Sequence, residues 1–288
     1  MTQFLGRDGN RLAADEAGNA GDPPVVLLHG GGQTRHSWGT TLGAVARKGW
    51  HAYAVDLRGH GESDWAPDGD YTLDAFAGDV LAISHALDPR PVLVGASLGG
   101  IASLAAIGEH TDEAVARALV LVDVAPRIEE QGRMRIGLFM MEHMEDGFAS
   151  LDAVADAIQQ YNPHRPRPTD LKGLQKNLRR GDDGRWYWHW DPAFIGGRLG
   201  SPDETRSSIV DPERLGKAAR ALTVPTLLVR GRMSDVVSED DARAFLAIAP
   251  HARYTDVSGA GHMVAGDRND RFTEAVVEFL SDVHRAPR

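Results

Sequence analysis

The sequence predicts a doubly wound α/β domain with a mostly parallel sheet, and two observations support this fold class. Short apolar runs that fit buried strands recur along the chain, and segments with helical spacing of apolar residues separate them. Strands and helices that alternate in this way form parallel sheets covered on both faces. The predicted strands comprise residues 24–28, 52–55, 91–94, 118–123, 225–230 and 253–257.

This alternation stops in the middle of the chain. Residues 126–210 contain helical pieces, such as 136–143 and 151–160, and no segment that we interpret as a strand. The strand pattern then resumes. We therefore predict an α/β core made of residues 1–125 and 211–288, with residues 126–210 inserted as a helical cap.

Composition limits the classes of partner. The chain has 288 residues, 42% of them hydrophobic and 25% charged, as in a soluble globular protein. Its net charge of −10 argues against nucleic acid or an anionic membrane surface as a partner. It has no cysteine, which excludes disulfides and thiolate catalysis. Since neither a signal pattern nor a bilayer-length apolar run is found, we expect a cytoplasmic location.

The stretch Gly95–Gly100 carries the clearest chemical signal. It reads Gly-Ala-Ser-Leu-Gly-Gly, a G-x-S-x-G pattern between a predicted strand and a small-residue helix. The glycines permit the strained turn that lifts the serine hydroxyl clear. A helix N-terminus also favours negative charge on a bound group. The pattern predicts Ser97 as a nucleophile; the alternative is a small residue that merely fits a tight turn.

A serine hydroxyl needs a base, usually a histidine that a carboxylate orients. Asp235 follows a late predicted strand and His262 follows the last one. The carboxyl ends of parallel strands lie at one edge of a sheet, so we expect Ser97, Asp235 and His262 to meet there. Their chain order is typical of a nucleophile on a strand–turn–helix elbow. Asp123 competes with Asp235 as the acid because it also ends a core strand.

Two backbone amides are expected to bind the oxyanion. One belongs to Leu98, directly after the nucleophile. The other comes from the loop at residues 29–32, and we expect it to be Gly31, because glycine lets the backbone approach a substrate closely. The acidic run at 142–146 is interpreted as a solvated helix end, so we expect no metal and no cofactor.

At these residues the chain resembles the α/β-hydrolase superfamily, and the resemblance covers the chain outside the cap. It implies an eight-stranded sheet. The matching residues are His29-Gly30, the segment 56–63, Gly95–Gly100, Asp235 after its strand, and Gly261-His262.

Within this superfamily the chain looks most like the capped esterases grouped with cofactor-free haloperoxidases, epoxide hydrolases and carbon–carbon bond hydrolases. The spacing of His29-Gly30 to Ser37-Trp38 resembles the haloperoxidase type. Gly31 departs from many such relatives, which have a bulky residue there, and the triple glycine is similar to that of lipases and carboxylesterases. Epoxide hydrolases have an aspartate nucleophile, so Ser97 argues against that activity.

The resemblance and the predicted site together imply a serine hydrolase. It would cleave an ester-like bond, a carboxylic ester or a lactone, of a small molecule through an acyl-enzyme. The alternatives are a carbon–carbon bond hydrolase or perhydrolase-type activity on the same residues, and a small-molecule sensor with slow turnover. The small-molecule substrate is the expected partner, with a homodimer as an open possibility.

Substrate specificity is expected to depend on the cap and the loops beside it. The tryptophans of the cap have an alternative interpretation as a core that docks it onto the sheet, and ordinary packing would explain the methionines equally well. The predicted substrate-binding residues are Trp38, Met140, Trp186, Trp188 and Met263.

Overall fold

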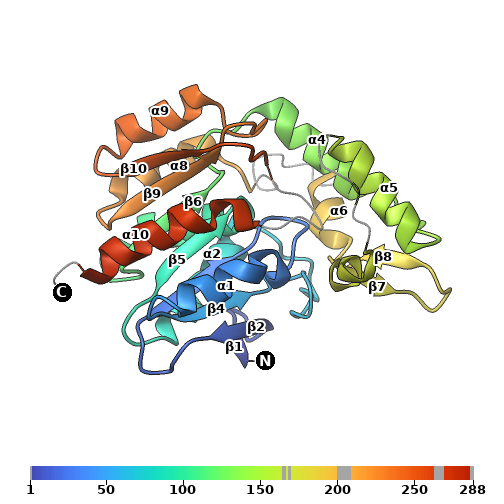
Figure 1. The fold of residues 1–288 in the computed structure, drawn as a ribbon, viewed down its shortest axis with the longest axis horizontal. Helices are drawn as coiled ribbons and strands as arrows, with labels where there is room; N and C mark the ends of the chain where they lie inside the picture. The colour runs from blue at the N-terminus through green and yellow to red at the C-terminus, as the bar shows by residue number, and fades with distance from the viewer. Residues whose placement is uncertain (1, 164–166, 168–169, 200–208, 263–268, 286–288) are drawn as a thin grey trace.

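In the computed structural model, an eight-stranded sheet forms the centre of the molecule (Figure 1). The structure describes residues 2–163, 167, 170–199, 209–262 and 269–285. The strands are β1 (Thr2–Leu5), β2 (Arg11–Ala17), β3 (Pro24–Leu28), β4 (His51–Val55), β5 (Val92–Ala96), β6 (Ala118–Val122), β9 (Thr226–Gly231) and β10 (Arg253–Val257). Their order across the sheet is β1-β2-β4-β3-β5-β6-β9-β10.

The sheet is mostly parallel, which confirms the predicted fold class. Only the pairs that involve β2 are antiparallel, with β1 on one side and β4 on the other. The remaining pairs from β4 to β10 are parallel. The nucleophile strand β5 therefore lies in the middle, between β3 and β6.

Helices cover both faces, and the alternation of side chains along the strands divides the core in two. Along β3, Val25 and Leu27 join one hydrophobic cluster and Val26 and Leu28 join the other, as expected when successive side chains point to opposite faces. One face packs on α1 (Gly39–Ala46) and α10 (Thr273–Arg285), and the other on α2 (Leu73–His85), α3 (Leu98–Gly108), α8 (Pro212–Ala221) and α9 (Glu239–Ile248).

Helix starts follow local hydrogen-bonding chemistry. The Thr72 hydroxyl accepts a hydrogen bond from the Ala75 amide at the start of α2. Ser238 and Asp241 form a reciprocal capping box at the start of α9. Such caps satisfy amides that a helix leaves unpaired in its first turn.

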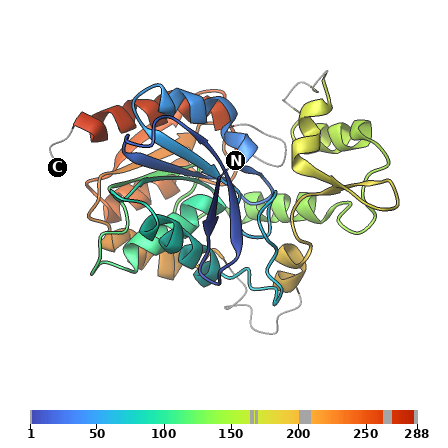
Figure 2. The same ribbon diagram turned by 90° about the horizontal axis from the view of Figure 1, so that it is seen from below.

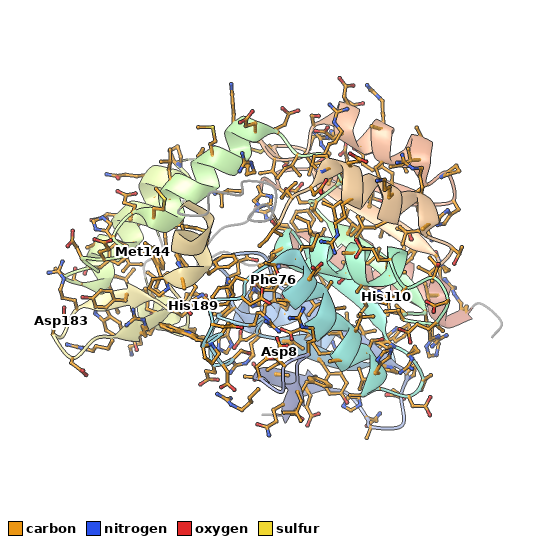
Figure 3. All side chains as sticks on the ribbon, turned by 180° about the vertical axis from the view of Figure 1, so that it is seen from behind. Asp8, Phe76, His110, Met144, Asp183 and His189 are labelled. Atoms are coloured by element: carbon orange, nitrogen blue, oxygen red, sulfur yellow. The ribbon has the colours of Figure 1, made fainter. Side chains whose placement is uncertain are left out.

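The segment between β6 and α8 lies to one side of the sheet (Figure 2). It contains α4 (Glu130–Met141), α5 (Leu151–Tyr161), η2 (Lys172–Asn177), β7 (Leu178–Arg180), β8 (Trp186–Trp188) and α6 (Ala193–Leu199). Figure 3 shows Asp183 at the outer end of this segment and His189 close to the core.

The prediction that this segment lacks strands is wrong. Strands β7 and β8 pair as a short antiparallel hairpin, and Phe148 adds a bridge to Trp186. Each strand has only three residues, which is too short for a period of two to be recognised. The sequence does carry a signal for the turn between them, the glycine at position 184. In the structure Gly184 adopts a positive φ of 77°, which glycine tolerates best.

Candidate functional site

Ser97 occupies a strained turn between β5 and α3. Its φ of 44° and ψ of −112° lie in a region that non-glycine residues rarely adopt. The flanking glycines are sterically required. A Cβ at Gly95 would lie 2.4 Å from the Gly100 amide nitrogen, and one at Gly99 would lie 2.6 Å from Leu28. The sequence motif therefore folds as the predicted elbow.

His262 is held by Asp123. The imidazole Nδ1 donates a hydrogen bond to Asp123 Oδ2 at 2.8 Å, and the two side chains are 5% and 4% exposed. Two further donors fix the carboxylate: the Gly231 amide to Oδ1 at 2.9 Å and the Ser234 hydroxyl to Oδ2 at 2.8 Å. In the neutral tautomer with the proton on Nδ1, Nε2 is the nitrogen that can accept a hydrogen bond.

The prediction that Asp235 orients His262 is wrong. The Asp235 carboxylate is 37% exposed and accepts a hydrogen bond from Arg135 on α4 at 2.7 Å. The loop after β9 points Ser234, not Asp235, at the buried carboxylate of Asp123. Asp123 reaches the histidine because it directly follows β6, the strand that pairs with β5.

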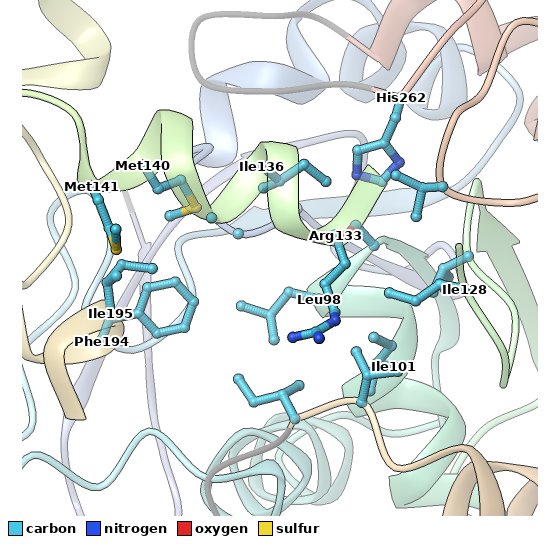
Figure 4. A pocket seen from close by; sticks show the side chains of 17 residues that line it. Leu98, Ile101, Ile128, Arg133, Ile136, Met140, Met141, Phe194, Ile195 and His262 are labelled. Carbon is cyan, nitrogen blue, oxygen red and sulfur yellow. The ribbon is translucent and has the colours of Figure 1, made fainter. Parts of the chain in front are cut away.

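Ser97 and His262 line the same cavity, which has a volume of about 550 Å³. Figure 4 shows side chains from α4 and α6 facing this cavity from the cap side. Its described walls consist of Gly31, Ser97, Leu98, Ile101, Val124, Ile128, Arg133, Ile136, Gly137, Met140, Met141, Phe194, Ile195, Ile209, Val210, Val236 and His262.

Gly31 and Leu98 also lie in this wall. The amides beside them are already paired: Gly30 donates to Gln33 Oε1 at 3.1 Å, and Gly32 donates to His60 Nε2 at 3.2 Å. The Gly99 amide donates to the His29 carbonyl at 3.1 Å, which fastens this loop to the elbow. Gly31 and Leu98, whose amides are the predicted oxyanion donors, thus belong to the same cavity wall as Ser97.

Buried histidines hold the loop at residues 29–32 and the segment 56–63. His29 donates from Nδ1 to the Gly30 carbonyl at 2.8 Å and accepts from the Leu57 amide at 3.0 Å. Burial lowers the pKa of His29 to about 4, so the ring is neutral. His189 accepts from the Gly61 amide at 2.7 Å, and burial also lowers its pKa. These histidines position backbone and do not reach the cavity.

Charged residues of the segment 56–63 form ion pairs with buried arginines or carboxylates. Arg35 is buried and forms ion pairs with Asp56 and Glu62. Arg58 is buried against Asp79, with an Nε–Oδ2 distance of 2.6 Å. Burying such charges requires pairing of this kind, and the pairs keep the segment folded beside the site.

The predicted substrate-binding residues have different outcomes. Met140 lines the cavity. Trp38 does not, because it is fully buried on the opposite face of the sheet. Trp186 and Trp188 are also absent from the wall and pack within the cap. Trp188 stacks on Trp190 with ring centroids 5.0 Å apart and belongs to the hydrophobic cluster that also contains residues of the sheet.

Met263 lies outside the described residues. The sequence interpretation missed Phe194, Ile195 and Arg133, which line the cavity from α6 and α4. The short apolar stretch at 193–195 was the available signal for the first two, but it is too brief to establish a helical face.

A strained serine and a carboxylate-bound histidine that face one apolar cavity at the carboxyl edge of a parallel sheet define a hydrolase-type site. The comparisons identify the family. A family model described as the alpha/beta hydrolase fold matches residues 23–268. The chain therefore belongs to the α/β-hydrolase family, as the motifs predicted.

Relatives of known name agree with this class. Esterase Rv0045c of Mycobacterium tuberculosis is 33% identical over 260 residues, covering 88% of this chain and 81% of that protein. A solved structure of the same esterase has a TM-score of 0.68 at 29% identity, covering 96% of this chain and 92% of that one. This similarity makes the chain an esterase-like hydrolase.

A second solved structure shows the likeness of fold. E-2-(acetamidomethylene)succinate hydrolase has a TM-score of 0.81 at 23% identity, and the match covers 97% of this chain and 98% of that one. Among the described residues, no helix is long and apolar enough to cross a membrane.

Proposed function

We propose that this protein is a serine hydrolase that cleaves a carboxylic ester or lactone of a small molecule through an acyl-enzyme. Ser97 is the nucleophile, His262 the general base and Asp123 the carboxylate that orients the histidine. The single observation that carries this proposal is the buried hydrogen bond of 2.8 Å between His262 and Asp123, beside a cavity that Ser97 also lines.

The reaction begins when His262 Nε2 takes the proton of the Ser97 hydroxyl, which attacks the carbonyl carbon. Asp123 stabilises the imidazolium that forms and keeps Nδ1 protonated. The amides of Gly31 and Leu98 donate hydrogen bonds to the oxyanion of the tetrahedral intermediate. The carbon–oxygen bond then breaks, and His262 returns the proton to the departing alcohol.

Deacylation repeats these steps with water. His262 takes a proton from a water molecule, the hydroxide adds to the acyl carbonyl, and Ser97 leaves as its hydroxyl regains a proton. The apolar cavity favours this chemistry because it excludes bulk water from the oxyanion and strengthens the hydrogen bonds to it. For a lactone, the alcohol stays attached to the acyl group and the product is one hydroxy acid.

Replacement of Ser97 by alanine tests the assignment. We expect hydrolysis of p-nitrophenyl butyrate to fall by about 10³-fold or more, because the covalent route is lost. Circular dichroism should show an unchanged fold. Full retained activity in the folded variant would contradict the proposal. A vinylogous diketone and a peroxide-dependent assay, run beside the esters, test the carbon–carbon and perhydrolase activities.

A further inference from the structure

Arg133 is the one permanently charged side chain among the described residues that line the cavity with Ser97. Apart from Ser97 and His262, the other described lining residues are apolar or glycine. Figure 4 shows the Arg133 side chain pointing from α4 into the cavity, beside Leu98 and Ile128. A guanidinium in an otherwise apolar wall is a candidate contact for an anionic group of a ligand.

Among the described residues, the one ion pair that Arg133 forms is a long one with Glu130 on the same helix. Glu130, one turn earlier on α4, lies 3.8 Å away, and the two side chains are 54% and 78% exposed. That separation exceeds a hydrogen bond, and exposed pairs of this kind contribute little. Arg135 differs, because it donates to Asp235 at 2.7 Å. The helix thus presents one paired arginine and one that is available at the cavity.

We infer that Arg133 determines specificity by binding a carboxylate on the substrate, away from the bond that Ser97 attacks. The preferred substrate class is then an ester or lactone with one free carboxylate and an apolar portion between the two ends. A guanidinium binds a carboxylate through two parallel hydrogen bonds. The apolar walls suit the hydrocarbon portion. The inference rests on the proposed function, since Ser97 fixes the reacting end.

A single negative charge fits this position better than a phosphate does. Arg133 brings one positive charge, and the Glu130 carboxylate is already nearby. A dianion would bring a second negative charge, which Arg133 does not neutralise and which Glu130 repels. The net charge of −10 also repels anions at long range. A preference for a carboxylate must therefore come from local contact with Arg133.

Matched substrates test this inference. One pair places the carboxylate on the acyl side: the mono-p-nitrophenyl ester of octanedioic acid and its methyl-capped neutral analogue. The other places it on the alcohol side: butyrate esters of 4-hydroxyphenylacetic acid and of its methyl ester. In at least one pair we expect kcat/KM to favour the carboxylate. Arg133→Gln should lower that ratio about tenfold, and Arg133→Lys should lower it less.

Arg127→Gln is the matched control. Arg127 lines a neighbouring depression together with Arg133, but it does not line the Ser97 cavity. Removing the Arg127 charge changes the net charge of the protein by the same amount as removing the Arg133 charge. In Arg127→Gln, the ratio of kcat/KM for the carboxylate substrate to that for its neutral analogue should therefore stay within about twofold of the wild-type value. An equal loss in both variants, or no carboxylate preference in either pair, would overturn the inference while leaving the hydrolase assignment intact.

Failure of the proposed function would look different, because neither the neutral nor the charged esters would then be cleaved. In that case, binding of octanedioic acid monomethyl ester to Ser97→Ala still tests Arg133. Isothermal titration should show weaker binding after Arg133→Gln and no change after Arg127→Gln. Equal binding to all these variants would contradict the inference.

Discussion

Two loops leave neighbouring strands at the same edge of the sheet, and each carries an aspartate. Asp123 directly follows β6, is 4% exposed and holds His262. Asp235 lies four residues beyond Gly231, the last residue of β9. Its side chain is 37% exposed and forms an ion pair with Arg135. Asp123 reaches the histidine because it is attached directly to the end of its strand. Asp235 lies on a suitable loop but farther from its strand, and it does not reach the histidine.

Exchanging each aspartate for asparagine is the strongest test of this contrast. Asp123→Asn should lower kcat by about 10³–10⁴-fold, because the amide favours the wrong histidine tautomer and does not stabilise the imidazolium. Asp235→Asn should change kcat by no more than about twofold, as expected for a surface substitution. The measurement is p-nitrophenyl butyrate hydrolysis by folded variants. Equal losses would mean that both carboxylates serve the reaction.

The contrast between buried and exposed side chains also predicts how the free energy of unfolding depends on pH. The pKa of fully buried His29 is about 4, against an ordinary 6.5, because burial disfavours the imidazolium. Between these values the unfolded chain binds a proton that the folded chain does not. The free energy of unfolding should therefore fall as the pH drops from about 6.5 to about 4, by about 3 kcal/mol for this group.

Urea unfolding across this pH range measures the effect of His29. His29→Gln should make the free energy of unfolding less dependent on pH, even though the variant is less stable overall. His85 provides the control, since it is 42% exposed and pairs with Glu113 at 2.9 Å. His85→Gln should leave the slope as it is. An unchanged slope after His29→Gln would show that this ring does not resist protonation.

The Arg135–Asp235 pair should give the smallest effect. Both side chains are substantially exposed, at 49% and 37%, so water screens their attraction. A double-mutant cycle with alanine at each position should give a coupling energy of about 1 kcal/mol or less. A coupling well above that would mean that this contact between α4 and the β9 loop stabilises the molecule more than its exposure implies.

Much of the site could be predicted because its residues belong to local patterns. Ser97, Leu98 and Gly31 lie in glycine-rich turns that follow apolar strands, and both sequence and backbone sterics point to the same geometry. His262 likewise directly follows its strand and turn. The parallel sheet follows from strands buried on both faces, such as β3 and β5, which appear in the sequence as continuous apolar runs.

The remaining parts depend on contacts between distant segments. Immediate attachment to a strand end favours Asp123, but the sequence does not show that the loop after β9 turns Asp235 away from His262 and toward Arg135. Trp38 is a large aromatic residue of a kind that often binds ligands, yet it is fully buried in the hydrophobic cluster on the other face of the sheet. Arg133 lies on a helix whose apolar face is poorly defined in the sequence, so only the structure shows that it lines the same cavity as Ser97.

The hydrogen bond between the Ser234 hydroxyl and Asp123 Oδ2, at 2.8 Å, has an evolutionary consequence. Side chains from two different strand ends already converge on the atom that holds His262. An acidic side chain at 234 and a small one at 123 would present a carboxylate to the same region. Two substitutions could thus transfer the role of orienting His262 from the end of β6 to the loop after β9, while His262 and Ser97 stay unchanged.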